Sequence, residues 1–215
     1  KISIIDPELM LTVPKRVTAS TGIDVFYHAL ESYISRRSNP ISEILSLKAM
    51  RLVADNLKGA YDHGQEIEYR EHMAWANTIA GMAINLTGVC GIHSLGQAIG
   101  GIYDIPHGET LAPVSLSYIR FCIPEVPEKL AIVAEILGVE TKGLSTLEAA
   151  EKSVEALEKF LESVNLPTKI STFGIKDEDI EELAQNAYNH LGYNFEFGPG
   201  KVTLDDIRRM FKDQL

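Results

Sequence analysis

GIHSLGQAIGGIYDIPHG, the segment Gly91–Gly108, places two histidines, His93 and His107, fourteen positions apart. The residues up to Gly101 have helical character, and the sequence 103–106, Tyr-Asp-Ile-Pro, then interrupts the helix. Proline is unfavourable inside a helix but suits the first turn of a new one. We therefore expect a second helix to begin at His107, with its imidazole facing His93 across a short loop.

A carboxylate and a third imidazole lie upstream, in the sequence TGIDVFYHALESY. Asp24 and His28 are four residues apart, which places both side chains on one helical face about one turn apart. One carboxylate and three imidazoles from two separate segments form a suitable ligand set for a divalent metal ion. The range Gly81–Ile102 contains no Asp, Glu, Lys or Arg. Polar groups buried there need a partner, and a metal ion would provide one.

Each of these residues also has a simpler interpretation. A single histidine on a helix is more often a hydrogen-bonded structural residue than a ligand, and we give His63, His72 and His190 that interpretation. Asp24 alone could be a first-turn carboxylate that complements the helix dipole. The joint pattern of the two segments favours the metal site.

The ligand types restrict the metal and its use. Three imidazoles and one carboxylate suit Fe(II) or Zn(II), whereas Mg(II) and Ca(II) prefer oxygen ligands only. Structural zinc sites rely on cysteine, so a histidine-rich set favours a Lewis acid with an open position. Such a metal ion could lower the pKa of an alcohol and prepare it for hydride loss.

Composition excludes several classes of protein. The 215 residues, 45% hydrophobic, are enough for one large domain or two small ones. The 30 acidic against 20 basic residues give a net charge of −10, which argues against nucleic-acid or membrane partners. No segment approaches the roughly 18 apolar residues of a membrane span. The two cysteines lie in apolar sequence, and we interpret them as buried thiols of a cytoplasmic protein.

Hydrophobic spacing and capping residues predict an all-α fold in a single helical metal-binding domain, residues 1–215. The expected helices cover 22–35, 42–57, 66–86, 93–101, 107–121, 130–137, 146–164, 177–188 and 204–211, and 192–200 is expected to be irregular. One short strand is expected at the start of the chain, where Lys1–Ile5 has β-branched character. Because the chain begins with Lys1 and not Met, we expect it to be part of a longer protein, with residues 1–6 as the remnant of a strand from a missing N-terminal domain.

Four segments together resemble one known family. They are DPELMLTVP (6–14), TGIDVFYHALESYIS (21–35), NPISEILSLKAMRLVADNL (39–57) and GIHSLGQAIGGIYDIPHGETLA (91–112). In order and spacing they resemble the C-terminal helical domain of the iron-containing (group III) alcohol dehydrogenases. The resemblance implies that Asp24, His28, His93 and His107 are the four metal ligands. It also implies a partner nucleotide-binding domain and NAD- or NADP-linked interconversion of small alcohols with aldehydes or ketones.

Two departures from the family pattern matter. Many relatives have another histidine four residues after the first of the pair, near the nicotinamide and substrate, where this chain has Gln97. An amide can hydrogen-bond but cannot relay a proton at neutral pH, so Gln97 is a candidate catalytic residue without a relay role. The chain also lacks a glycine-rich phosphate loop after a strand, and Gly96, Gly100 and Gly101 are interpreted as helix-packing glycines. Within the first segment, Leu9 is a candidate cofactor-binding residue.

The leading hypothesis is the metal-binding part of an NAD(P)-dependent alcohol dehydrogenase or aldehyde reductase, with the isolated chain inactive. One alternative is a related dehydroquinate-synthase-like or glycerol-dehydrogenase-like enzyme. The former would need basic residues around the metal, and the sequence near His93 and His107 has none. Another alternative is a non-catalytic metal-binding or oligomerisation module. A homo-oligomer is also allowed, because an isolated domain would expose an apolar surface.

Overall fold

The computed structural model describes residues 2–215, and these residues form helices and loops without a strand. The α-helices are α1 (Lys15–Ile34), α2 (Pro40–Asp62), α3 (Ile67–Thr87), α4 (Gly91–Tyr103), α5 (His107–Cys122), α6 (Pro127–Ile136), α7 (Thr146–Ser163), α8 (Ile180–Phe195) and α9 (Leu204–Lys212). Three short 3-10 helices are η1 (Pro7–Met10), η2 (Ile170–Phe173) and η3 (Asp177–Asp179). The predicted all-α fold is confirmed.

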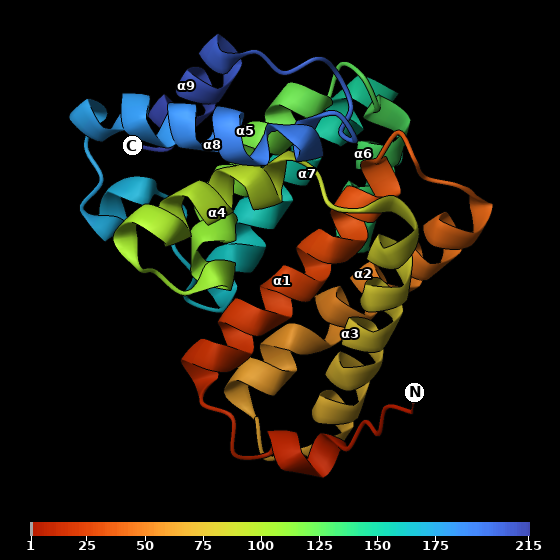
Figure 1. The fold of residues 1–215 in the computed structure, drawn as a ribbon. Coiled ribbons are helices and arrows are strands. Elements are labelled where there is room, and N and C mark those ends of the chain that lie inside the picture. Colours follow the sequence, from red (N-terminus) through yellow and green to blue (C-terminus); the bar gives the residue numbers. More distant parts are fainter. Residues whose placement is uncertain (1) are drawn as a thin grey trace.

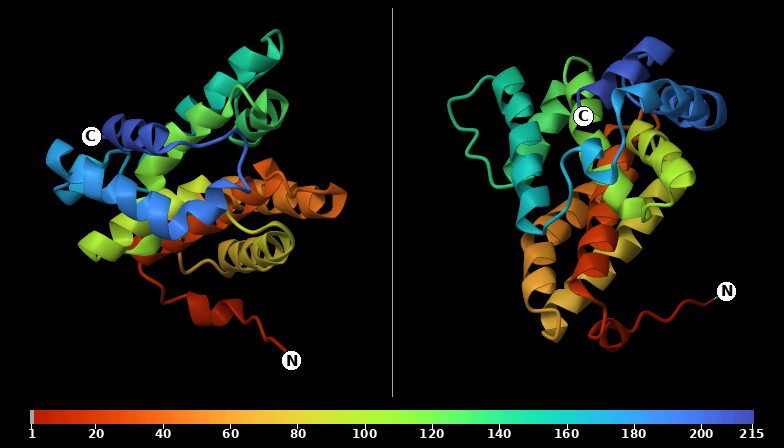
Figure 2. Two further views of the ribbon diagram at one scale, coloured as in Figure 1. Left: turned by 45° about the horizontal axis from the view of Figure 1, so that its top comes forward. Right: turned by 90° about the vertical axis from the view of Figure 1, so that its left-hand side faces the viewer.

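The helices form two groups that meet along α1. Helices α1, α2 and α3 lie side by side, joined by short connections, and each packs on the other two (Figure 1). Helix α4 packs on α5 and α8, α8 packs on α9, and α6 packs on α7. Helix α5 also packs on α1, and Figure 2 shows these two groups from two further directions. The contact of α5 with α1 is held by a buried hydrogen bond of 2.8 Å between Tyr27 Oη and Ser115 Oγ.

Two helices extend past their predicted boundaries and contain glycines near those boundaries. Helix α1 begins at Lys15, seven residues before Gly22, and α2 continues through Gly59. A Cβ added at Gly22 would lie 2.3 Å from Leu57 Cδ1, and one at Gly59 would lie 2.3 Å from the Tyr69 ring. Both glycines therefore allow neighbouring side chains to approach the helix, and the predicted boundaries at these positions were wrong.

The starts of α2 and α8 and the end of α8 also differ from the predicted boundaries. Asn39, not Ser42, caps α2, and the Ser42 side chain completes the reciprocal capping hydrogen bonds. Asp177 begins the 3-10 turn η3, and α8 follows from Ile180. Helix α8 then continues to Phe195, into the stretch that was expected to be irregular.

The glycines of α4 differ in their surroundings. A Cβ at Gly96 would meet Leu111 Cδ2 at 2.5 Å, so Gly96 allows the close packing of α4 on α5. A Cβ at Gly100 would lie 3.4 Å from the Ile105 carbonyl oxygen, an ordinary contact distance. Gly101 has no neighbouring atom within 4 Å of such a Cβ. The packing interpretation is therefore confirmed for Gly96 and wrong for Gly101.

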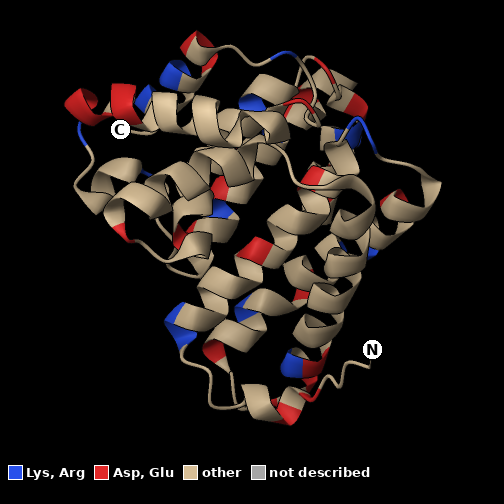
Figure 3. Ribbon diagram, viewed as in Figure 1, with Lys and Arg blue, Asp and Glu red and all other residues tan. Residues whose placement is uncertain are grey.

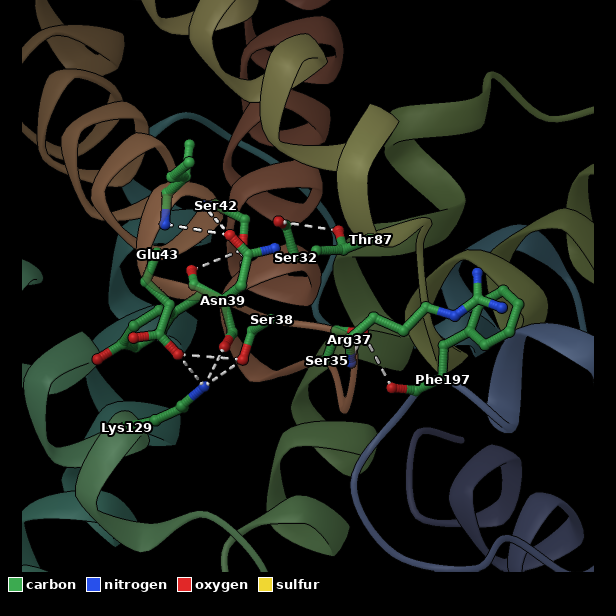
Figure 4. A network of polar contacts seen from close by, with 12 residues as sticks. Ser32, Ser35, Arg37, Ser38, Asn39, Ser42, Glu43, Thr87, Lys129 and Phe197 are labelled. Carbon is green, nitrogen blue, oxygen red and sulfur yellow. Dashed lines mark hydrogen bonds and ion pairs between the residues drawn. The ribbon is translucent and has the colours of Figure 1, made fainter.

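A polar network fixes the loop between α1 and α2 (Figure 4). Lys129 Nζ, from α6, donates to the Tyr33 carbonyl oxygen at 2.7 Å, to Ser38 Oγ at 2.8 Å and to Glu43 Oε1 at 2.7 Å. The ammonium lowers the pKa of the Glu43 carboxyl below its usual value. The far end of α1 is thus tied to both α2 and α6, which restricts its movement relative to the rest of the domain.

The first residues of the chain carry no regular structure between Ile2 and Asp6. The strand expected at residues 1–5 was therefore wrong for Ile2–Ile5, which have no second strand to pair with among the described residues, and Lys1 lies outside those residues. The role of residues 1–6 as a remnant of another domain stays a prediction. No single helix among residues 2–215 is long and apolar enough to cross a membrane; only α3 and α4 taken together, across a bend of 105°, meet such a criterion. Lys and Arg are scattered among Asp and Glu over the visible face (Figure 3).

Candidate metal centre

The four side chains selected from the sequence meet where α1, α4 and α5 come together. Asp24 and His28 lie one turn apart in α1, His93 is near the start of α4, and His107 is the first residue of α5. Asp24 Oδ1 lies 3.6 Å from His28 Nε2, 3.3 Å from His93 Nε2 and 3.7 Å from His107 Nε2. One carboxylate oxygen therefore has three imidazole nitrogens around it.

The cluster is closed on one side and open on the other. The His93 side chain is 3% exposed, whereas that of His107 is 42% exposed. The His28 and His93 rings stack with centroids 4.8 Å apart, and the His107 ring is tilted against His93 with centroids 5.3 Å apart. Of the three histidines in the cluster, His107 is thus the most accessible.

Two atoms at the centre of the cluster are buried without a hydrogen-bond partner. These atoms are Asp24 Oδ1 and His93 Nε2. A buried polar atom without a partner costs roughly 1–3 kcal/mol, so two such atoms facing one another require an explanation. Donor atoms of Asp24, His28 and His93 all lie within 4.8 Å of one another. A nitrogen- and oxygen-rich set of this size fits a divalent transition-metal ion, which would satisfy both atoms.

The pKa values of the cluster residues depend on burial and on the charges of their neighbours, which act in opposite directions. Burial alone would raise the pKa of Asp24, but the three neighbouring imidazoles, His93 first, bring it below its ordinary value. Burial lowers the pKa of both His28 and His107, which favours their neutral, ligating form. Burial also disfavours the charged form of His93, but the nearby carboxylates of Glu31 and Asp24 outweigh it and raise this pKa to about 9.

Glu31 is a buried acid that sequence analysis did not select. Its side chain is 0% exposed, and it lies in α1 one turn after His28. Glu31 Oε2 lies 2.5 Å from His93 Nδ1, and Glu31 Oε1 accepts hydrogen bonds from the backbone N–H groups of Ile92 at 2.6 Å and His93 at 3.4 Å. The spacing of Asp24, His28 and Glu31, at i, i+4 and i+7, places all three on one helical face and was the signal that could have identified it.

The first turn of α5, which carries His107, is fixed to α1 by two contacts. Arg16 Nε donates to Glu109 Oε1 at 2.6 Å, and Arg16 Nη2 donates to Glu109 Oε2 at 2.9 Å, which forms a two-point ion pair. A Cβ at Gly108 would lie only 1.9 Å from the Ser20 carbonyl oxygen, so the two backbones are in direct contact there. Neither contact was predicted, because the partners lie more than eighty residues apart in the sequence.

Two hollows border the cluster, and Asp24 lines both. One, of about 320 Å³, lies beside Pro106, His107 and Glu109. The other, of about 450 Å³, lies beside Met10 of η1, Met73 of α3 and several residues of α1. Arg16 lines the first hollow, so the structure brings a basic residue near His107 that local sequence did not show, although its charge is paired with Glu109.

The two remaining candidates lie at the surface. Gln97 is exposed in α4, one helical turn after His93. Leu9 is 77% exposed in η1, and its neighbour Met10, not Leu9, lines the hollow next to Asp24. The catalytic role of Gln97 and the cofactor contact of Leu9 stay predictions.

Comparisons with known proteins agree with the fold. Residues 18–215 match the model of the Fe-containing alcohol dehydrogenase family, C-terminal. The chain is 35% identical to the NAD-dependent methanol dehydrogenase of Bacillus methanolicus, over 100% of this chain and 56% of that protein. It is 38% identical to the 1,3-propanediol dehydrogenase of Klebsiella pneumoniae, over 98% of this chain and 54% of that protein.

The structural comparison gives the same result. A crystal structure of 1,3-propanediol oxidoreductase superposes with a TM-score of 0.94 at 35% identity, over 98% of this chain and 55% of that one. The chain belongs to the iron-containing alcohol dehydrogenase family, of which it matches the C-terminal part, as the sequence resemblance predicted. It spans about half the length of the curated relatives it matches.

Proposed function

We propose that this chain is the metal-binding part of a metal-dependent, NAD(P)-linked alcohol dehydrogenase or aldehyde reductase. The observation that carries the proposal is the position of Asp24 Oδ1, within 3.7 Å of the Nε2 atoms of three histidines and without a hydrogen-bond partner. Family membership supports oxidoreductase chemistry, and the donor set supports Fe(II) or Zn(II).

The residues of the cluster have distinct tasks in this proposal. Asp24, His28, His93 and His107 would hold the ion. A bound divalent ion supplies Lewis-acid polarisation of an alcohol or carbonyl oxygen. The more exposed His107 borders the hollow of about 320 Å³, a volume suited to a small substrate. Gln97, one turn after His93, can donate or accept a hydrogen bond there but cannot relay a proton.

The nicotinamide cofactor and the substrate class are supported by the names of relatives. One relative is named as NAD-dependent, and a sulfoacetaldehyde reductase with a TM-score of 0.82 and 26% identity was crystallised in complex with NAD+. The alcohols named among relatives range from methanol to choline. This range supports a small alcohol or aldehyde as the substrate class, with a nucleotide-binding domain as the partner that holds the cofactor.

The test uses metal content and turnover together. We expect about one equivalent of iron or zinc per chain by elemental analysis, and loss of that metal in a His93→Ala, His107→Ala double variant. In the longer protein that joins the chain to a nucleotide-binding domain, His107→Ala is expected to abolish NAD(P)-linked alcohol oxidation while circular dichroism shows the same helical content.

A matched control removes an imidazole outside the cluster. His190 is exposed in α8, so His190→Ala should keep both metal and turnover. Absence of metal from the wild-type chain after incubation with Fe(II) and Zn(II) would refute the metal site. Full turnover of the His107→Ala variant would refute the role of the cluster in the reaction.

A further inference from the structure

The buried carboxylate of Glu31 makes contacts that concern one residue of the cluster only. One carboxylate oxygen faces the ring nitrogen Nδ1 of His93, and the other accepts from the backbone N–H groups of Ile92 and His93. Glu31 therefore touches both the main chain and the imidazole of His93. We propose that Glu31 is the positioning residue that fixes the orientation and tautomer of His93 for metal binding; this inference rests on the metal site proposed above.

The contact of Glu31 with the imidazole ring sets the tautomer of His93. An ionised carboxylate only accepts hydrogen bonds, so a neutral His93 must carry its proton on Nδ1 to satisfy Glu31 Oε2. Nε2 then keeps its lone pair. This lone pair belongs to the buried atom that faces Asp24 Oδ1 at 3.3 Å without a hydrogen bond. With His93 in this neutral form, the two atoms would be facing acceptors, and a cation placed between them would satisfy both.

Glu31 also binds the backbone at the start of α4. The first N–H groups of a helix have no partner within the helix, and the Cys90 side chain provides no cap for α4. Glu31 Oε1 provides the missing cap by accepting from the Ile92 N–H group. The helix dipole also favours a negative charge at this end of α4. Glu31 thus fixes the start of α4 relative to α1. Since Asp24 and His28 are in α1, the same contact sets the distance between the two groups of ligands.

Glu31 is not placed to be a metal ligand itself. His93 lies between Glu31 and Asp24, with Nδ1 toward the former and Nε2 toward the latter. A carboxylate behind a ligating imidazole orients the ring and raises its basicity, and loss of such a partner typically weakens metal affinity about 10- to 100-fold. Glu31, with Oε2 at 2.5 Å from His93 Nδ1, lies in the position of such a carboxylate.

Glu31→Gln separates the two hydrogen-bonding tasks without changing the volume. A carboxamide has one acceptor oxygen and one NH2 donor. If its oxygen keeps the Ile92 N–H, its NH2 group faces His93 Nδ1, and the imidazole proton must move to Nε2. If the amide is reversed, two donors meet at the N-terminus of α4. Either arrangement opposes the ligating form of His93.

The experiment measures the Zn(II) dissociation constant of the chain by competition with a chelator. We expect a weakening of about 10- to 100-fold in Glu31→Gln. The matched control is Ser32→Ala, which changes the next residue of α1, also fully buried, whose Oγ accepts from Thr87 Oγ1 at 2.9 Å. This control should lower stability without changing the dissociation constant. Equal Zn(II) affinity in wild type and Glu31→Gln, or an equal loss in Ser32→Ala, would overturn the inference.

A second measurement uses the wild-type chain and does not depend on any variant. Nitrogen-15 NMR of the Zn(II)-loaded chain should show His93 with its proton on Nδ1 and Nε2 bound to the metal. Zn(II) bound through Nδ1 would overturn the role of Glu31 and leave the metal site intact. A wild-type chain that binds no Zn(II) would instead refute the proposed function itself.

Discussion

At the scale of single residues, the position of His107 depends on the glycine that follows it. Gly108→Ala would place a Cβ 1.9 Å from the Ser20 carbonyl oxygen, a backbone atom of α1 that cannot rotate away. The first turn of α5 must then move and take His107 with it. We expect a loss of about 1–3 kcal/mol in the free energy of unfolding, measured with urea, together with weaker Zn(II) binding.

The same chain provides a control for this prediction. Gly101→Ala is also a glycine substitution within a helix, α4, but nothing lies within 4 Å of the new Cβ. Alanine is favoured over glycine in a helix by about 0.5–1 kcal/mol, so this variant should be as stable as the wild type or slightly more so. Unchanged Zn(II) binding and stability in Gly108→Ala would contradict the proposed close contact.

Residues whose chemistry and spacing are both unusual can be identified from the sequence. Histidine and aspartate in a charge-poor part of the chain are identifiable without coordinates, and the structure brings Asp24, His28, His93 and His107 together as predicted. Glu31 was missed because the chain has many acidic residues on helices, and its burial depends on a contact with α4, sixty residues away. Partners that are distant in sequence carry no local signal.

At the scale of helices, the sequence predicted which segments are helical better than where they end. Gly22 and Gly59 have the low helix propensity of boundary residues, but both lie inside helices because a bulky neighbour, Leu57 or Tyr69, occupies the space above them. His107 was placed correctly at the start of α5, because Pro106 constrains the local backbone. Local sequence therefore indicates where a helix could begin or end. Packing between helices decides whether it does so there.

An ion pair between α8 and α9 should make the stability of the fold depend on pH in the acidic range. Arg208, in α9, forms a two-point ion pair with Glu181, in α8, at 2.7 and 2.8 Å. These hydrogen bonds, with a smaller effect of Gln185, lower the pKa of Glu181 from 4.5 to about 2. Because the folded pKa is below the unfolded one, the pair stabilises the fold fully above pH 4.5, and this stabilisation is lost as the pH falls toward 2.

Arg208→Gln should therefore lower the melting temperature near neutral pH, by a small amount because the pair is exposed. Thermal unfolding followed by circular dichroism should show the difference from wild type shrinking as the pH falls from 4.5 toward 2. Glu181→Gln should reproduce the loss at neutral pH. A difference between wild type and Arg208→Gln that is constant over this pH range would contradict the assignment of the effect to Glu181.

At the scale of the whole domain, the cluster lies at the junction of the two groups of helices. Helix α1 belongs to the group with α2 and α3, whereas α4 and α5 connect to α8 and α9 (Figure 1). Four ligands from three helices would bind one ion only in the folded state, since the two segments that carry them are distant in the unfolded chain. Metal binding and the association of the two groups are therefore coupled.

This coupling predicts a metal-dependent melting temperature for the chain. At a free metal concentration of 100 times the dissociation constant, binding to the folded state alone adds about 2.7 kcal/mol. For a domain of this size that corresponds to a rise of about 5–11 °C in the melting temperature. Zn(II) should produce the rise and a strong chelator should reverse it, whereas Mg(II), which prefers oxygen ligands, should have little effect. The His93→Ala variant should melt at the same temperature with and without Zn(II). A Zn(II)-induced rise of equal size in this variant would show that the ion binds outside the cluster, because His93 is the ligand that links α4 to the carboxylate of α1.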